Sequence, residues 1–397
     1  MQAPAPGSET RDALVVGAGL AGAAAALRLR EAGRSVLVLA DGDGATAFAT
    51  GAIEPDERLP GAALHWLASV VPEAVTAAPD GGTWRLATMA GRLVEALAAP
   101  AASLDLGRLP FRRVGVLGAD VSGAPSLAGL AALLEEAVGG TPRFVPLAVP
   151  LAVPDALALH SAGTLRGLLA SDAGLARDLA AGVARAVREA EVDAALLPSY
   201  VPPATAAAAA AAAEVPTGRL LGTYGTSGAG RELAAALRSA MERAGAGSVA
   251  GRVRTLERRG DRWVALAEDG TMLGAGRTAI VATGGAAGGG VRREGRLFAE
   301  PAAGRLAWGT ALLEQQSAPH GPAADAFLPP RLFDEPAIRS LGIAVDDELR
   351  PAGAAPGLML AGALAVPPDG RATGLAWALA SGLRAAALVA KVLDARS

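Results

Sequence analysis

Three glycines at G-x-G-x-x-G spacing, Gly17, Gly19 and Gly22, directly follow a short apolar strand and constrain the fold more than any other segment. An Ala- and Leu-rich helix comes next, then a second apolar strand, 35–40, and then Asp41. This is the order of a βαβ unit, which holds a nucleotide's phosphates at the helix N-terminus. The segment therefore predicts a Rossmann-like nucleotide-binding unit; the alternative is a glycine turn in an unrelated α/β domain.

The composition is typical of a soluble globular protein. The chain has 397 residues, of which 51% are hydrophobic and 19% charged, so about two or three domains are expected. Only 3% of the residues are aromatic, so Ala, Leu and Val must supply most of the packing. The net charge is −3 and there is no basic block, so no nucleic-acid partner is predicted.

The chain contains no cysteine and has 3 histidines, His65, His160 and His320, far apart in the sequence. This excludes disulfides and a cysteine-ligated iron–sulfur cluster within the chain, and no metal site is predicted. Residues 1–10 are expected to form a disordered leader. No membrane-spanning segment is predicted, because the best apolar candidate, 144–159, contains three prolines, and a cytoplasmic location is expected.

Hydrophobic periodicity gives a coarse secondary structure for the remaining residues. Helix is predicted for most of 59–97 and for 126–138, 165–190, 206–213, 231–244 and 374–389. Strands are predicted at 113–118, 144–153, 193–198 and 277–283, with a strand meander over 249–273.

Three strands that are far apart in the sequence end in glycine, at Gly17, Gly284 and Gly362. In two-domain flavoproteins the first such turn holds the cofactor phosphates, and a strand ending in A-T-G packs beside it. The third turn brings a strand end and a helix N-terminus towards the flavin. Glycine suits each position because backbone must pass close to the ligand. The three turns in this order favour a flavin site over a nicotinamide-only domain, which has no use for the third.

The chain resembles the B-subunit family of the anaerobic glycerol-3-phosphate dehydrogenase complex, flavoproteins of the fumarate reductase/succinate dehydrogenase-like class. The most specific segment is 341–351, LGIAVDDELRP, which precedes the strand ending at Gly362. The resemblance also rests on the first glycine turn and on the segments 47–51, 114–118 and 280–291.

This resemblance implies that the chain helps to oxidise sn-glycerol 3-phosphate to dihydroxyacetone phosphate with a non-covalent FMN or FAD. Electrons would pass through a cysteine-rich iron–sulfur partner of the C type to quinone. A second flavoprotein, of the A type, would carry most of the substrate chemistry, so the isolated chain could lack turnover. The complex would lie in the cytoplasm, or on the inner face of the cell membrane through its partners.

The predicted architecture is an α/β fold with a discontinuous Rossmann-like, FAD/NAD(P)-binding-type flavin domain. Segments 11–105, 220–290 and 335–397 would form this domain, and 106–219 with 291–334 would form an inserted α/β cap or partner-facing region. The predicted cofactor-binding residues are Gly17, Ala18, Gly19, Leu20, Ala21, Gly22, Asp41, Thr50, Gly51, Thr283, Gly284 and Gly362.

Two positions depart from the usual flavoprotein pattern. Ala40 stands where flavoproteins that bind the adenosine ribose of FAD have glutamate, with Asp41 one residue later. Either Asp41 serves after a small shift, or the ribose contact is absent, which would suit FMN. Ala363 stands where an acidic residue often lies near the ribityl chain.

No catalytic residue is predicted. His320 is a candidate base, and the candidate cations for a substrate phosphate are Arg292, Arg293, Arg296, Arg350 and Arg371. The alternative is that these arginines are solvated or paired with Asp346, Asp347 and Glu294. Two other functions stay open: a stand-alone FAD oxidoreductase of another small hydroxy- or amino-acid, and a degenerate flavoprotein-fold scaffold for a redox partner.

Overall fold

The structure is a computed structural model. It describes residues 9–107, 111–118, 126–150, 162–222, 228–285, 288–294, 297–300, 302, 342–369 and 374–396. The chain forms two compact units. The first contains Met1–Thr46, Asp56–Ala63 and Ala234–Ser397, and the second contains Ala47–Pro55 and Leu64–Leu233.

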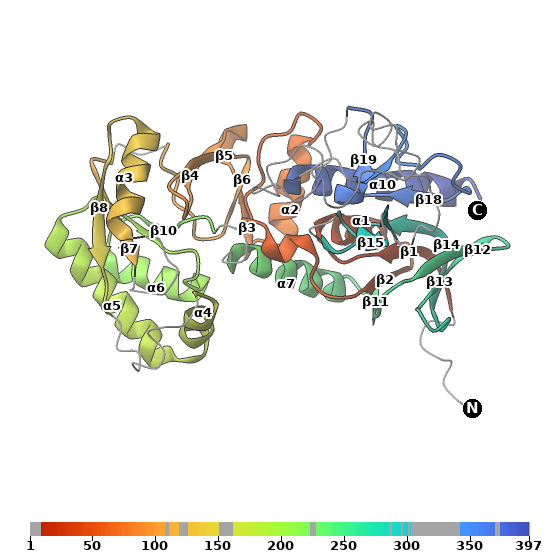
Figure 1. The fold of residues 1–397 in the computed structure, drawn as a ribbon, viewed down its shortest axis with the longest axis horizontal. Coiled ribbons are helices and arrows are strands. Elements are labelled where there is room, and N and C mark those ends of the chain that lie inside the picture. The colour runs from red at the N-terminus through yellow and green to blue at the C-terminus, as the bar shows by residue number, and fades with distance from the viewer. Residues whose placement is uncertain are drawn as a thin grey trace. The chain divides into compact units, whose positions relative to one another are not determined.

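The first unit is built on a mixed sheet with the strand order β11-β2-β1-β14-β13-β12, in which β18 also pairs with β14 (Figure 1). Its strands are β1 (Thr10–Val16), β2 (Val36–Ala40), β11 (Gly247–Ala250), β12 (Thr255–Arg259), β13 (Arg262–Leu266), β14 (Met272–Val281) and β18 (Leu358–Leu360). The pairs that involve β11, β2, β1 and β18 are parallel, whereas β12, β13 and β14 pair antiparallel. The carboxyl-terminal ends of the central strands β1 and β14 are continuously buried, as expected for parallel strands covered on both faces.

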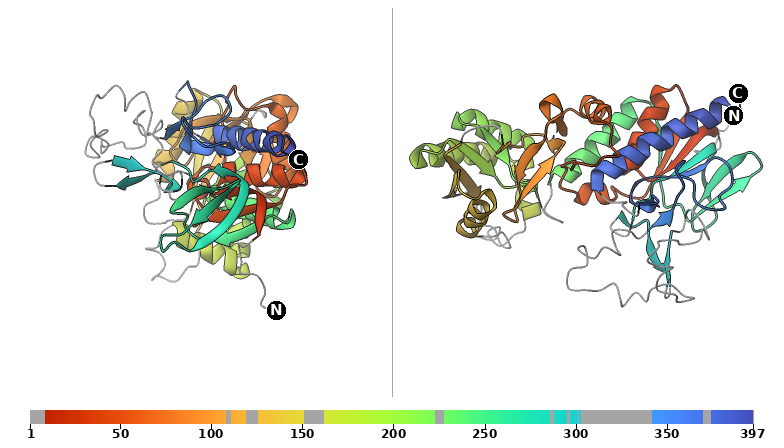
Figure 2. Two further views of the ribbon diagram at one scale, coloured as in Figure 1. Left: turned by 90° about the vertical axis from the view of Figure 1, so that its right-hand side faces the viewer. Right: turned by 90° about the horizontal axis from the view of Figure 1, so that it is seen from above.

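Two helices of the first unit, α1 (Leu20–Glu31) and α10 (Gly374–Asp394), lie alongside each other (Figure 1, Figure 2). They pack closely because a Cβ at Gly382 would fall 2.3 Å from the carbonyl oxygen of Ala21. By length and apolar composition α10 is the one helix in the described part of the chain that could cross a membrane, yet half of its apolar window is buried in the protein. Its packing against α1 accounts for its apolar residues without a membrane.

The first unit also contains several shorter elements. They are η1 (Ala45–Phe48, which runs into the second unit), β15 (Arg292–Glu294), β16 (Leu297–Ala299), β17 (Ile343–Ala344), η6 (Gly362–Leu364) and β19 (Ala365–Val366).

The second unit contains a parallel four-stranded sheet with the order β10-β9-β7-β8. Its elements are β7 (Arg113–Gly118), α3 (Leu127–Val138), β8 (Arg143–Ala148), α4 (Ala162–Ser171), α5 (Ala173–Ala190), β9 (Ala194–Leu197), α6 (Pro203–Ala213) and β10 (Thr217–Arg219). Alternate β7 side chains enter different cores: Val114 and Val116 pack with α3, and Leu117 with α5 and α6. The chain winds to one side of β7 and then to the other, as in doubly wound α/β folds.

The predicted fold class, a discontinuous Rossmann-like α/β domain with an inserted α/β region, is confirmed. The unit boundaries lie elsewhere than the sequence suggested: 64–105 and 220–233 group with the second unit. Helix α7 (Gly228–Arg243) begins in that unit and ends in the first. The leader was expected to reach residue 10, whereas β1 begins at Thr10.

The prediction of helix over most of 59–97 is wrong. Only α2 (Gly61–Val70) is an α-helix there, and it is followed by β3 (Val75–Ala77), η2 (Pro79–Gly81), β4 (Trp84–Ala87), β5 (Leu93–Ala96) and β6 (Ala98–Pro100). Strands β4 and β5 form an antiparallel hairpin, and its turn includes Gly91 at φ +72°. Strand pairing overrides local helical preference in this segment.

The predicted meander over 249–273 is also only partly right. Strand β11 is not part of it, because it pairs in parallel with β2 through the register Val249↔Leu39. The antiparallel strands begin later, with β12. The segment therefore first adds β11 to the parallel edge of the sheet and then forms β12 and β13 at the opposite edge.

Candidate functional site

Four strands of the first unit end at the same edge of the sheet. Residues at or next to their last positions are in register: Leu39 pairs with Val16, Val16 with Val281, and Val281 with Leu360. Backbone hydrogen bonds continue one residue further, from Gly17 N to Leu39 O (2.8 Å), Ala282 N to Val16 O (2.7 Å) and Ala361 N to Val281 O (3.0 Å). The carboxyl edge of a parallel sheet is where α/β proteins bind ligands. The structure thus brings all three predicted glycine turns to one edge.

The first turn packs its backbone directly against the second. Gly17 has φ +110°, and a Cβ there would lie 2.3 Å from the carbonyl oxygen of Ala282 and 3.0 Å from Thr283 N. A Cβ at Gly22 would lie 1.9 Å from the carbonyl oxygen of Gly17. Side chains cannot be accommodated at either position without backbone movement. These two glycines therefore shape the turn.

Two backbone N–H groups in the first turn of α1 have no acceptor in the part of the chain that the structure describes. Gly19 is its extended N-cap and forms no side-chain capping bond. The Leu20 N–H donates to Thr46 Oγ1 at 2.8 Å, whereas the Ala21 and Gly22 N–H groups have no acceptor among the described residues. These free donors and the helix dipole suit an anionic phosphate. Thr46, which is buried, was not predicted; its only sequence signal is a hydroxyl in the small-residue loop after β2.

The second turn contains Thr283 and Gly284, the latter at φ +83°. A Cβ at Gly290 would lie 2.2 Å from the carbonyl oxygen of Gly284, so the following segment folds back tightly. The Thr283 hydroxyl donates to Glu300 Oε1 at 3.0 Å, and Glu300 is only 1% exposed. No sequence pattern marks Glu300, because the contact joins residues on either side of a hairpin.

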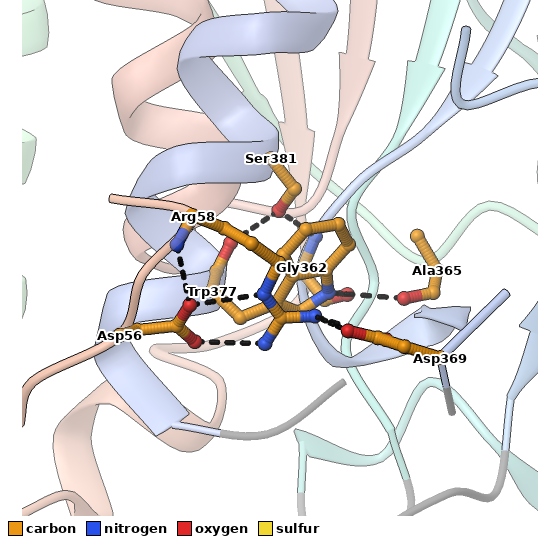
Figure 3. A network of polar contacts seen from close by, with 7 residues as sticks. All are labelled: Asp56, Arg58, Gly362, Ala365, Asp369, Trp377 and Ser381. Carbon is orange, nitrogen blue, oxygen red and sulfur yellow. Dashed lines mark hydrogen bonds and ion pairs between the residues drawn. The ribbon is translucent and has the colours of Figure 1, made fainter. Parts of the chain in front are cut away.

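The third turn is held by two side chains of α10 (Figure 3). Gly362 (φ +71°) donates its N–H to Ser381 Oγ at 2.9 Å, and its carbonyl accepts from Trp377 Nε1 at 3.0 Å. The same Nε1 lies 3.0 Å from the carbonyl oxygen of Ala365. A Cβ at Gly362 would lie 3.1 Å from Cβ of Ala21, so the third turn adjoins the first turn of α1.

The acidic residue after β2 is engaged by an arginine. Arg252 Nε lies 2.8 Å from Asp41 Oδ2, and each side chain is 53% exposed. Arg252 follows β11, the strand beside β2. Because an exposed ion pair contributes little to stability, Asp41 can exchange this partner for another hydrogen-bond donor.

The structure does not place the remaining predicted residues at this edge. Thr50 and Gly51 belong to the second unit, where Thr50 Oγ1 accepts from Ala52 N at 3.3 Å and Gly51 packs against Pro100 and Ala229. Arg350 is exposed and paired with Asp346 at 3.0 Å and Glu348 at 2.7 Å. The other candidates, His160, His320, Arg296, Arg371 and the side chains of Arg292 and Arg293, lie outside the described part.

The second unit contains a buried cluster of charged residues. Glu232, on α7, accepts from Arg219 at 2.9 and 2.7 Å and from Arg166 at 2.7 Å. The Arg219 side chain is 4% exposed and that of Glu232 is 14% exposed. Burial alone would raise the pKa of the Glu232 carboxyl, but the hydrogen bonds and charges of the two arginines outweigh burial and lower it.

Comparison with known proteins agrees with this geometry. Residues 12–197 match the family model described as FAD dependent oxidoreductase. The chain has the fold of an FAD-dependent oxidoreductase. This match includes the first glycine turn and extends through β9 of the second unit. No curated protein matches the chain.

Several solved structures resemble the chain at low similarity. The GidA-related protein from Thermus thermophilus is 11% identical, with 97% of this chain and 100% of that chain covered and a TM-score of 0.34. The 3-ketosteroid-delta4-(5alpha)-dehydrogenase from Rhodococcus jostii RHA1 is 17% identical, with 71% and 47% covered and a TM-score of 0.25. The peptidyl tryptophan dihydroxylase QhpG is 15% identical, and the chain spans only 33% of its length, with a TM-score of 0.26. These TM-scores are too low to bear on substrate or reaction.

Proposed function

We propose that this chain is the flavin-bearing, B-type component of an anaerobic glycerol-3-phosphate dehydrogenase complex. In this proposal it accepts electrons from the oxidation of sn-glycerol 3-phosphate to dihydroxyacetone phosphate. A cysteine-rich iron–sulfur partner of the C type carries them to quinone, and an A-type flavoprotein provides most of the substrate contacts. The complex would work in the cytoplasm, or on the inner face of the cell membrane through its partners.

The observation that carries the proposal is the alignment of the three glycine turns at one edge of the sheet. The free N–H groups of Ala21 and Gly22 would bind the cofactor phosphate, because they point out of a helix N-terminus with no acceptor among the described residues. Gly17 and Gly284 would let backbone approach the cofactor. The residues present therefore fit a flavin nucleotide.

The segment 341–351 supports the finer assignment through its place in the fold. Strand β17 pairs in parallel with β19, and Val345 N donates to Val366 O at 3.0 Å. Leu360 N donates to Leu349 O at 2.9 Å, so the segment lies beside β18, the strand that leads to Gly362. The most specific part of the resemblance thus supports the third turn directly.

The absence of cysteine from the chain is consistent with the division of labour in such a complex. A flavin held at the three glycine turns would supply the electron acceptor for oxidation of the secondary alcohol, and the hydroxyl proton would need a base. An iron–sulfur relay must then lie in another polypeptide, because its thiolate ligands are missing here. The base is unassigned.

The family match supports FAD as the cofactor, whereas Ala40 and the occupied Asp41 favour FMN, which has no adenosine ribose. The two cofactors make different demands on this end of the sheet. If FAD binds, Asp41 would leave Arg252 and accept hydrogen bonds from the ribose hydroxyls. If FMN binds, the ion pair between Asp41 and Arg252 would stay intact.

The test is to purify the chain, record its absorption spectrum and identify the released cofactor by chromatography. We expect a yellow protein with non-covalent flavin. A colourless protein that takes up neither FMN nor FAD would contradict the proposal. Reduction of the bound flavin by glycerol 3-phosphate, measured with and without the partner proteins, then tests the substrate.

A stand-alone FAD oxidoreductase of another small hydroxy- or amino-acid is the second candidate, because the family match names only the cofactor and the reaction type. It would be favoured if the isolated chain reduced an artificial acceptor with such a substrate. Glycerol 3-phosphate would then have no effect even when the partners were supplied.

A further inference from the structure

We propose that Arg58 is a positioning residue of the flavin site: it fixes the indole of Trp377, and through it the Gly362 turn. This inference rests on the proposed function. Arg58 contacts Trp377, which in turn binds Gly362. It acts one contact away, on the ring that holds the third turn (Figure 3).

The Arg58 guanidinium is fixed from two sides. Asp56 accepts from Nε at 2.9 Å and from Nη2 at 2.7 Å, and its Oδ1 also accepts the Arg58 backbone N–H at 2.9 Å. The Oδ1 of Asp369 lies 3.3 Å from Nη1. The Asp56 side chain is 15% exposed, so this two-point carboxylate pair is shielded from water. Few orientations of the guanidinium satisfy both carboxylates.

The fixed guanidinium covers the indole of Trp377. Cζ of Arg58 lies 4.5 Å from the ring centroid, which is a cation–π contact. Trp377 is buried, and its Nε1 binds the carbonyl oxygens of both Gly362 and Ala365. A rotation of the indole would break both hydrogen bonds. Arg58 therefore restrains the group that orients the turn.

Side chains of α10 bind both polar backbone groups of Gly362, whose carbonyl also accepts the Ala365 N–H. Ser381 accepts the Gly362 N–H and donates to the Trp377 carbonyl at 2.6 Å, so the hydroxyl and the indole are linked. Gly362 in turn lies against Ala21, in the first turn of α1 that would bind the cofactor phosphate. A displacement of Gly362 would therefore also displace the edge of the sheet that is proposed to face the flavin.

The first test replaces Arg58 by methionine, which keeps the length of the side chain and removes its charge. Loss of a partly desolvated cation–π contact, worth about 1–2 kcal/mol, should weaken flavin binding about 5- to 30-fold in titrations of the apoprotein. The midpoint potential of the bound flavin should shift too. Arg58→Lys should recover part of the affinity, because lysine keeps the cation but not the two-point pair with Asp56.

Arg259→Met is the matched control. Arg259 also makes two hydrogen bonds with a carboxylate, that of Glu257, but it is exposed and stacks on no ring among the described residues. Its replacement should leave both flavin affinity and midpoint potential unchanged. Equal affinity and potential in wild type and Arg58→Met would overturn the proposal.

A second variant tests the route through Trp377. Trp377→Phe keeps a ring beneath Arg58 and removes the Nε1–H donor to Gly362. If Arg58 acts through this indole, the double variant should lose less affinity than the two single losses combined. Additive losses would show that Arg58 acts by another route and would overturn the proposal. Should Arg58→Met fail to fold, Arg58→Lys takes its place in the cycle.

Hydrogen exchange separates this inference from the proposed function, because it needs no flavin. In the apoprotein, the Gly362 N–H should exchange faster in Arg58→Met than in wild type or Arg259→Met. Unchanged exchange contradicts the positioning role. A wild type that binds no flavin while the Gly362 exchange still responds to Arg58 would overturn the proposed function, and with it the link from this turn to a cofactor.

Discussion

Gly22 lies so close to Gly17 that a Cβ at position 22 would fall 1.9 Å from the Gly17 carbonyl oxygen. This contact brings the first turn of α1 against the end of β1. The last glycine of the G-x-G-x-x-G motif is therefore a packing residue, whereas Gly19 is open except for the Thr46 hydroxyl at 3.2 Å. The two positions should respond differently to substitution.

Gly22→Ala should destabilise the protein by about 3 kcal/mol or more, because backbone must move to admit the methyl group. The free energy of unfolding in urea measures this. Gly167→Ala is the control: Gly167 lies inside α4 with no atom within 4 Å of its Cβ position, so alanine should stabilise the protein by up to about 1 kcal/mol. Equal effects at both sites would contradict the packing argument.

Gly19→Glu should abolish flavin binding while the fold survives. A carboxylate at the N-cap complements the helix dipole, but it repels a phosphate about 4 Å away by about 4 kcal/mol. Flavin affinity should fall by more than about a hundredfold, as measured by fluorescence titration. Gly61→Glu makes the same change at the start of α2, where the space is open, and should leave affinity unchanged. Retained binding in Gly19→Glu would place the phosphate elsewhere.

Asp41→Asn should distinguish the two flavins. If the adenosine ribose lies beside Asp41, FAD affinity should fall about tenfold and FMN affinity should not change. Asp43→Asn is the matched control, because Asp43 also forms an exposed ion pair, with Arg238. Dissociation constants for both flavins, measured with the apoprotein, decide the matter. An unchanged FAD affinity would show that Asp41 binds no ribose.

Glu232 should make stability depend on pH at the acid end. Its pKa is lower in the folded protein than in the unfolded chain, so its stabilisation is complete above the unfolded value and is lost as pH falls through the folded value. Wild-type stability should therefore decline below about pH 4.3, more steeply than that of Glu232→Gln.

At neutral pH, Glu232→Gln should cost about 3 kcal/mol, because Arg219 and Arg166 lose their shared counter-charge. Glu31→Gln, which removes an exposed partner of Arg28, should cost less than about 0.5 kcal/mol. Urea unfolding across the pH range measures both variants. Parallel pH profiles for wild type and Glu232→Gln would exclude Glu232 as the titrating group.

The sequence was most informative where a pattern is local. The βαβ unit around Gly17 could be predicted because strand, glycine turn and helix follow one another within about 30 residues. The turns at Gly284 and Gly362 were found from their order along the chain, and the register of Val16, Val281 and Leu360 brings them together. Their roles toward a cofactor remain predictions.

Contacts between distant segments could not be predicted in this way. Thr46, Glu300 and Arg58 have no periodicity or motif, and each acquires its partner only when the chain has folded. Most of 59–97 was predicted to be helix, although hairpin pairing decides the structure of 84–96. Tertiary context overrides local preference there.

The insertion of Leu64–Leu233 has a consequence for synthesis on the ribosome. Strands β1 and β2 emerge early, but their neighbour β14 begins at Met272 and β18 at Leu358, so the central sheet must wait for these late segments. At typical elongation rates this delay is on the order of ten seconds or more. The inserted unit is nearly continuous in the chain and can fold during that time. The apolar face of α1 stays uncovered until α10 is made, which makes the nascent N-terminal segment a natural client for chaperones.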